Sequence, residues 1–254
     1  MMKRLEDFFK MLFKALFSDS ENNVIETNVS EDIVLGAPIT NVVTQYENVK
    51  ILIDNGHGFD TGGKKSPYSC YGVEPAIEFY EYKWNREIAK PIVERLKEMG
   101  YNADLIVTEE NDISLLERVK RINKVCDEYG AGNVLMVSVH ANAAGNGKQW
   151  LNAKGWSAFT TRGNTKSDKL AEFLYDAATV NFPDRKIRTD KSDGDRDWET
   201  NFYICLHSKC PAVLTENFFY DNTDDVQYIL SDEGREAVIK THIDGITNYI
   251  KDTF

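Results

Sequence analysis

Two of the four histidines in this 254-residue chain directly follow apolar runs that are typical of buried strands. His57 lies in Asp-Asn-Gly-His-Gly at residues 54–58, and His140 lies in Ser-Val-His-Ala-Asn at residues 138–142. One histidine at such a place is more often a hydrogen-bonded core residue, but two at equivalent strand ends make a metal site an equally good explanation. Two neutral imidazoles and one carboxylate, with one position left open, form a common arrangement for zinc in hydrolases.

Acidic residues at two other places could complete a site of this kind. Glu78 and Glu81 lie in an acidic stretch that opens the first helix of the main domain, and their spacing alone does not choose between them. Taken alone, that stretch is an ordinary helix N-terminus, where acidic side chains interact favourably with the helix dipole. Glu216 ends the apolar run 211–215 and would face the same rim as both histidines. Alone it is a strand-end carboxylate satisfied by backbone amides, and its convergence with the histidines makes it a candidate site residue.

From residue 49 onward, short apolar strands alternate with helices. These elements must position the candidate side chains. The predicted strands cover residues 49–54, 103–107, 133–139, 155–160 (an edge strand), 202–206 and 212–215. The predicted helices cover residues 76 or 82 to 97, 115–129, 167–181 and 233–251. This alternation predicts an α/β fold: a three-layer sandwich with a mostly parallel central sheet flanked by helices. Ligands of such sheets bind beyond the carboxyl ends of the strands, where both histidines and Glu216 fall.

The first 47 residues differ in character from the rest of the chain. Residues 4–17 carry seven apolar side chains at helical spacing, so residues 1–17 are predicted to form an amphipathic helix. Residues 18–47 are polar and acidic and are predicted to be a linker. The helix either docks on the main domain, associates with another copy, lies on a membrane surface or attaches to a larger particle. The sequence does not choose among these roles.

Composition excludes several classes of protein. The formal net charge of -11 and the pI near 4.9 argue against sequence-independent binding of nucleic acid, which needs clustered Lys and Arg. No apolar run is long enough to span a bilayer. The four cysteines show no CxxC pair, so neither a disulfide scaffold nor a structural zinc knuckle is expected. Lys10 and Lys14 interrupt the apolar N-terminal stretch, so we expect no cleavable signal and synthesis in the cytoplasm.

The chain from Val49 to its C-terminus resembles the zinc N-acetylmuramoyl-L-alanine amidases of bacterial cell-separation enzymes and many phage endolysins. The resemblance rests on four motifs that occur in order, at residues 53–58, 81–85 with Ile88 and Ala89, 137–143 and 211–216. Each motif is weak alone, and the ordered set is specific. The family's helix motif has a Glu four residues before an Asn, so the resemblance selects Glu81, which precedes Asn85, over Glu78. Asn217 stands where the family often has glycine.

The resemblance implies that residues 48–254 form a catalytic domain with one Zn²⁺, held by His57, Glu81 and His140. It implies hydrolysis of the amide between N-acetylmuramic acid and L-alanine in peptidoglycan, with Glu216 as the catalytic group that takes a proton from water. The expected place of action is the cell wall or periplasm, after release or delivery, as a phage-type lysin or a wall-remodelling enzyme. The alternatives are a zinc hydrolase of another amide, such as a peptidase or deacetylase, and a non-catalytic wall-binding or particle-attached module.

Other polar residues carry weaker expectations. His207 and His242 are predicted to be structural or exposed. Asp54 and Asn142 are candidates to accept hydrogen bonds from the zinc-binding rings. The polar stretch 190–197 is predicted to be a surface loop near the cleft.

Overall fold

The computed structural model describes residues 46–67 and 78–254. The predicted helix at residues 1–17 and nearly all of the predicted linker at residues 18–47 lie outside the described residues. All of the candidate site residues lie inside them. No helix in the described ranges is long and apolar enough to cross a membrane.

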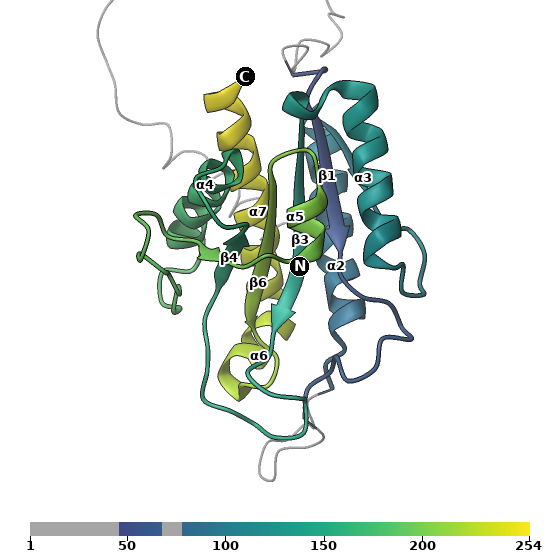
Figure 1. Ribbon diagram of the computed structural model, residues 1–254. Helices are drawn as coiled ribbons and strands as arrows, with labels where there is room; N and C mark the ends of the chain where they lie inside the picture. The colour runs from purple at the N-terminus through teal and green to yellow at the C-terminus, as the bar shows by residue number, and fades with distance from the viewer. Residues whose placement is uncertain (1–45, 68–77) are drawn as a thin grey trace, which may run out of the picture. The chain divides into compact units, whose positions relative to one another are not determined.

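One six-stranded sheet forms the centre of the described part of the chain (Figure 1). Its strands are β1 (Lys50–Asn55), β2 (Asn102–Leu105), β3 (Val134–Asn142), β4 (Ser157–Thr160), β5 (Trp198–Glu199) and β6 (Ala212–Phe219). They lie in the order β2-β1-β3-β6-β4-β5. Pairing is parallel from β2 to β6, whereas β4 runs antiparallel to β6 and parallel to β5. The predicted mostly parallel sheet is therefore confirmed.

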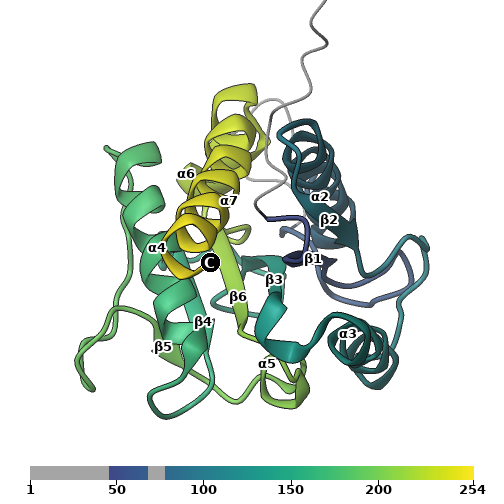
Figure 2. The ribbon, with the colours of Figure 1, turned by 90° about the horizontal axis from the view of Figure 1, so that it is seen from above.

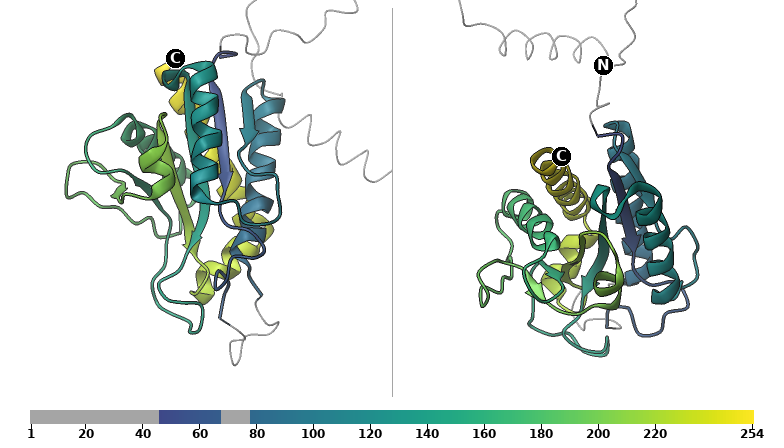
Figure 3. Two further views of the ribbon diagram at one scale, coloured as in Figure 1. Left: turned by 45° about the vertical axis from the view of Figure 1, so that its right-hand side comes forward. Right: turned by 45° about the horizontal axis from the view of Figure 1, so that its top comes forward.

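Helices cover both faces of the sheet and complete a three-layer sandwich (Figure 2). One face carries α2 (Glu81–Glu98), α4 (Lys166–Asn181) and α7 (Asp232–Thr253), with α6 (Thr223–Leu230) packed against α7. The other face carries α3 (Leu115–Tyr129) and the short α5 (Tyr203–His207). Figure 3 (left) shows β1 between α2 and α3. The predicted α/β sandwich is thus confirmed as well.

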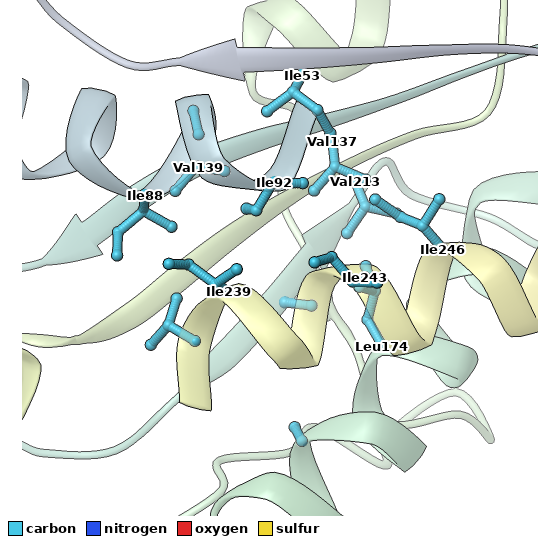
Figure 4. Close-up of a cluster of buried hydrophobic side chains, with 14 of the residues drawn as sticks. Ile53, Ile88, Ile92, Val137, Val139, Leu174, Val213, Ile239, Ile243 and Ile246 are labelled. Carbon is cyan, nitrogen blue, oxygen red and sulfur yellow. The ribbon is translucent and has the colours of Figure 1, made fainter. Parts of the chain in front are cut away.

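Each face of the sheet buries its own apolar cluster. Successive side chains of a strand point to opposite faces, so Ile53 joins the cluster under α2 and α7, whereas Leu52 joins the cluster under α3. Figure 4 shows part of the larger cluster: Ile53, Val137, Val139 and Val213 from the sheet with Ile88, Ile92, Leu174, Ile239, Ile243 and Ile246 from the helices. Because β1 and β3 are packed on both faces, their carboxyl ends are held in fixed positions.

One predicted strand is a helix. Residues 202–206 were expected to extend, but they form the turn of α5, in which the Leu206 N–H donates to the Phe202 carbonyl. Only Ile204 and Cys205 in this segment are buried. The segment therefore covers the smaller apolar cluster with one helical turn. An apolar run this short does not distinguish a strand from a helix, which is why the prediction was wrong.

The edge of the sheet also differs from the prediction. Residues 155–160 were expected to form an edge strand, but β4 lies inside the sheet between β6 and β5. The two residues of β5 pair with Phe159 and Thr160, and a strand of this length has no periodicity to detect. The last long strand runs beyond the predicted 212–215 to Phe219. This extension carries the chain past Glu216 within the sheet.

His242 is buried on α7, and its ring joins that helix to β6. Nδ1 donates to the Val238 carbonyl at 2.8 Å, so Nε2 accepts from the Thr215 hydroxyl at 2.9 Å. Burial lowers the pKa of His242 to about 4. The histidine is structural, as predicted, and it is held in its neutral form.

This arrangement predicts a loss of stability in mild acid. Between the ordinary pKa of 6.5 and about 4, the unfolded chain binds a proton at His242 that the folded chain does not bind. We therefore expect the free energy of unfolding to fall from about pH 7 to about pH 5, and to fall less in His242→Gln. Urea unfolding at the two pH values measures both slopes, with the exposed His207→Gln as control. Equal falls in wild type and His242→Gln would contradict this role.

Candidate active site

Three side chains of types that can bind a metal ion meet where β1 and β3 end. His57 Nε2 lies 3.4 Å from Glu81 Oε1, and His140 Nδ1 lies 3.0 Å from the same oxygen. The three donor atoms all lie within 4.8 Å of one another. Within the ranges 46–67 and 78–254, this is the one cluster of three or more such side chains. Two imidazole nitrogens and one carboxylate oxygen are a donor set that fits zinc.

The parallel pairing of β1 and β3 places the two histidines side by side. Asn55, the last residue of β1, lies opposite Val139, so both strands reach the carboxyl edge of the sheet together. His140 is the next residue of β3, and His57 follows β1 after Gly56. His57 has a φ of 66°, in the left-handed region that side chains other than glycine rarely adopt. The chain therefore turns sharply at His57 as it leaves the sheet.

Glu81 and Asn85 lie one turn apart on the buried side of α2. The Asn85 side-chain amide donates to the Gly56 carbonyl at 3.1 Å. The helix turn that supplies Glu81 thus also fixes the loop that carries the first histidine, which gives a physical reason for the spacing of four. Glu78 is exposed and accepts a hydrogen bond from the Tyr80 hydroxyl, away from the three-residue cluster.

The Glu81 carboxylate is buried with one oxygen unused. The residue is 1% exposed, and Oε2 has no hydrogen-bond partner in the described residues, with Lys64 Nζ 4.0 Å away. Burial alone would raise the pKa of Glu81, but hydrogen bonds and charges from His140 and His57 outweigh it and hold the pKa below its usual range. A buried carboxylate needs a compensating partner, and a metal ion between the imidazoles would provide one.

The His140 ring lies directly over Gly56. A Cβ atom on residue 56 would come within 2.0 Å of His140 Cε1 and 2.3 Å of Nε2, which is far inside contact distance. Burial lowers the pKa of His140, but the hydrogen bond and charge of Glu81 outweigh that effect and raise it. The ring is thus positioned by the glycine below it and by the carboxylate beside it.

We expect Gly56→Ala to fold and to bind zinc at least about tenfold more weakly, because the new methyl group displaces the His140 ring. Competition with a chromogenic chelator measures the affinity. Gly62→Ala is the matched control, since a Cβ there has no atom within 4 Å. Equal zinc affinity in the two variants would show that the ring position does not depend on Gly56.

Glu216 faces the histidines from the neighbouring strand. It lies opposite His140 on the β3 side and opposite Ser157 on the β4 side. Glu216 Oε2 and Ser157 Oγ are both buried without a hydrogen-bond partner in the described residues. Burial raises the pKa of Glu216 to about 8; the charge of His140 opposes this rise and that of Glu81 adds to it. A carboxyl group with such a pKa can both release and take up a proton near neutral pH.

Asn217 fixes the strand immediately after Glu216. Its Nδ2 donates to the His140 carbonyl at 2.9 Å, and its Oδ1 accepts from Trp156 Nε1 at 2.8 Å. Phe218 then has a φ of 68°, and the pairing with β3 shifts by one residue at this point. The bulge and the buried amide together set the position of the glutamate relative to His140.

Two arginines hold the loop of His57. Arg118 is 1% exposed on α3, and its guanidinium donates to Asp54 Oδ1 at 2.5 Å and to the His57 carbonyl at 3.2 Å. Arg86 donates to the same carbonyl at 3.0 Å. The Ser138 hydroxyl donates to the other Asp54 oxygen at 2.6 Å. This network joins α2, α3, β1 and β3 behind the first histidine.

Sequence reasoning missed this role for arginine. Asp54 and Asn142 were both candidates to accept from a histidine ring, but Asp54 pairs with Arg118, and Asn142 accepts from the Ala143 N–H. Neither side chain has a hydrogen bond to an imidazole ring in the part of the chain that the structure describes. The available signal was the place of Arg118 on the buried face of α3, where a charged residue requires a partner.

A cavity of about 350 Å³ opens over the cluster. The residues that line it include His57, His140 and Glu216 and six apolar or aromatic ones: Ile113, Leu115, Phe202, Tyr203, Ile204 and Leu214. Lys64 and Arg118 also reach it. The site therefore combines a metal-ligand cluster, a buried carboxyl group and space for a substrate.

Comparison with known proteins identifies relatives of this chain. Residues 51–248 match the family model described as N-acetylmuramoyl-L-alanine amidase. The amidase CwlM of Bacillus licheniformis is 28% identical over 202 residues, which cover 78% of this chain and 67% of that protein. The endolysin of Bacillus phage SPP1 is 25% identical over 205 residues, which cover 79% of this chain and 65% of that protein. The chain thus spans about two thirds of the length of these two relatives.

Solved structures share the fold. The N-acetylmuramoyl-L-alanine amidase of Clostridium difficile 630 superposes with a TM-score of 0.65 at 22% identity, covering 81% of this chain and 98% of that chain. The catalytic domain of CwlV from Bacillus (Paenibacillus) polymyxa var. colistinus gives a TM-score of 0.62 at 21% identity. The match covers 81% of this chain and 99% of that chain. The described α/β sandwich is therefore a known architecture.

Proposed function

The chain belongs to the N-acetylmuramoyl-L-alanine amidase family, and we propose that His57, Glu81 and His140 hold the zinc ion with which it hydrolyses this amide of peptidoglycan. One observation carries the proposal: the two imidazole nitrogens converge on a buried carboxylate that has an unused oxygen. Three protein ligands with an open position are the usual arrangement of a catalytic zinc site, whereas structural zinc sites are closed by four.

Zinc in such a site polarises a carbonyl group and lowers the pKa of water. The protein's own residues do the rest. Glu216 lies opposite His140 on the adjoining strand, where its carboxylate takes a proton from the attacking water and then gives it to the departing L-alanine nitrogen. The raised pKa of Glu216 suits it to hold that proton between the two transfers. General acid–base help of this kind contributes about a hundred- to ten-thousandfold in rate.

The apolar and aromatic residues that line the cavity exclude water around the reacting amide. Asn217 and Arg118 keep Glu216 and His57 in place through partly buried hydrogen bonds, so these groups are positioned before the substrate binds. The 25% identity with a phage endolysin supports action on the cell wall as a lysin. Delivery through residues 1–47, and the membrane, self-association or particle docking predicted for residues 4–17, stay predictions.

The test is hydrolysis of isolated sacculi with and without a chelator, followed by zinc add-back. We expect new amino groups on L-alanine, no new reducing sugar ends, loss of activity with the chelator and recovery with zinc. New amino groups on another residue would replace this proposal by a zinc peptidase or deacetylase. Stoichiometric zinc without any new amino groups would indicate a wall-binding module that does not catalyse.

A further inference from the structure

Arg188 carries a positive charge that no group in the described residues neutralises. Its guanidinium contacts two aromatic rings, 5.1 Å from the centre of the Trp198 ring and 5.0 Å from the centre of the Phe219 ring. Arg185 and Arg196 in the same segment each pair with a carboxylate. In the part of the chain that the structure describes, the Arg188 side chain has neither an ion pair nor a hydrogen bond, although the residue is half-buried.

The backbone of Arg188 is hydrogen-bonded to two residues of the buried core. Its N–H donates to the Trp156 carbonyl at 2.8 Å, and its own carbonyl accepts from the Tyr175 hydroxyl at 2.9 Å. Trp156 and Tyr175 are both fully buried. Contact with the two aromatic rings restrains the guanidinium further and leaves its planar set of N–H groups unused. The side chain is thus prepared to bind an anion at little cost in conformational entropy.

One of the two rings that contact the guanidinium belongs to the strand that carries Glu216. Phe219 belongs to β6 and Trp198 to β5, and β4 lies between these strands (Figure 2). The one-residue shift in pairing places Phe219 opposite Asn142, two residues after His140, so its side chain returns to the face of Glu216.

The two sides of the scissile amide differ in charge: the peptide side is charged and the adjoining sugar is not. The lactyl carboxyl group of N-acetylmuramic acid is consumed in the scissile amide, so the sugar next to the bond carries no charge. The stem peptide carries free carboxylates beyond L-alanine. This protein has a formal net charge of -11, which repels an anionic peptide. A positively charged side chain without an ion pair can offset this repulsion locally.

We propose that Arg188 binds a carboxylate of the stem peptide and directs the peptide half of the substrate over β4 toward the β5 edge. This inference rests on the proposed amidase function. Its consequence is specificity: a stem peptide whose second residue has a free α-carboxylate is a better substrate than the same peptide with that group amidated. A guanidinium and a carboxylate form two parallel charge-assisted hydrogen bonds, which an amide cannot reproduce.

The experiment uses two muropeptides that are identical except for a carboxylate or an amide at that position. For wild type, kcat/KM should be about tenfold or more higher for the carboxylate form. Arg188→Gln should raise KM for the carboxylate form and leave both constants for the amide form unchanged, so the preference disappears. Arg188→Lys keeps the charge without the planar fork and should retain part of the preference. The exposed Arg162→Gln is the control and should behave as wild type.

If wild type has nearly the same kcat/KM for the two muropeptides, the proposal is wrong. An Arg188→Gln variant that loses activity equally on both substrates would also overturn it. Activity on the amide form serves as the control for correct folding. If Arg188 had only a structural role, its substitution would lower the turnover of the amide form too. If the zinc-loaded wild type cleaves neither muropeptide, the amidase function itself fails. Equilibrium binding of the same pair to Glu216→Gln then tests Arg188 separately, and equal affinities would rule out the carboxylate contact.

Discussion

Glu216→Gln keeps its zinc and loses about a hundred- to ten-thousandfold in kcat. The amide side chain fills nearly the same volume opposite His140 but has no carboxylate to take a proton from water. Because Glu216 is not among the three clustered ligands, zinc content should stay at one per chain. Steady-state hydrolysis of solubilised peptidoglycan and metal analysis of the same preparation measure both quantities.

Glu78→Gln is the matched control for this variant. Glu78 is an acid that sequence spacing alone leaves as a candidate, and it is exposed outside the cluster, so its removal should leave kcat unchanged. Full activity in zinc-loaded Glu216→Gln would remove Glu216 from the proton transfers. Loss of zinc from the same variant would instead show that Glu216 contributes to metal binding.

His140→Ala should lose both zinc and activity. The substitution removes one of three donor atoms and leaves the Glu81 carboxylate buried beside a single histidine. The loss of this partner for a buried carboxylate then lowers the stability of the fold as well, by up to about 3 kcal/mol. Isothermal titration with zinc and urea unfolding measure the two effects. His207→Ala, an exposed histidine on α5, should change neither.

The two variants distinguish the roles of the residues. A chain that has lost His140 should not recover activity at saturating zinc, because two remaining ligands do not fix the metal relative to Glu216. Wild-type zinc affinity in His140→Ala would mean that the metal is held elsewhere. That result would overturn the assignment of all three ligands, since their donor atoms lie within 4.8 Å of one another and would share one ion.

Much of the fold was predictable because long strands and helices have strong periodicity. The strand before His57 and the helix at Leu115–Tyr129 occupy almost the predicted residues: the strand is a continuous buried run, and the helix is buried along one side. The failures are short elements. α5 contains five residues and β5 contains two, and packing against neighbours rather than local pattern decides their conformation.

The residue types of the candidate metal site could be predicted from the sequence. The contacts that hold these residues in position could not. Histidines at the ends of two apolar strands can be recognised from the sequence, because parallel strands end at one edge. The choice of Glu81 over Glu78 needed the family resemblance, and the structure supplies the reason in the hydrogen bond from Asn85 to Gly56. The contacts of Arg118 and Arg188 join segments far apart in the chain, so no local pattern reveals them.

The most direct measurement of the central claim is hydrolysis of peptidoglycan in water labelled with heavy oxygen, followed by mass spectrometry of the fragments. Attack at the lactyl carbonyl beside His140 and Glu216 places one labelled oxygen in the freed carboxyl group of N-acetylmuramic acid and leaves L-alanine with an unlabelled amino group. We predict this pattern, and we predict that it disappears with a chelator and returns with zinc. Label in a peptide carboxyl group or at a sugar reducing end would contradict the account, because a different bond would then be the one that this site hydrolyses.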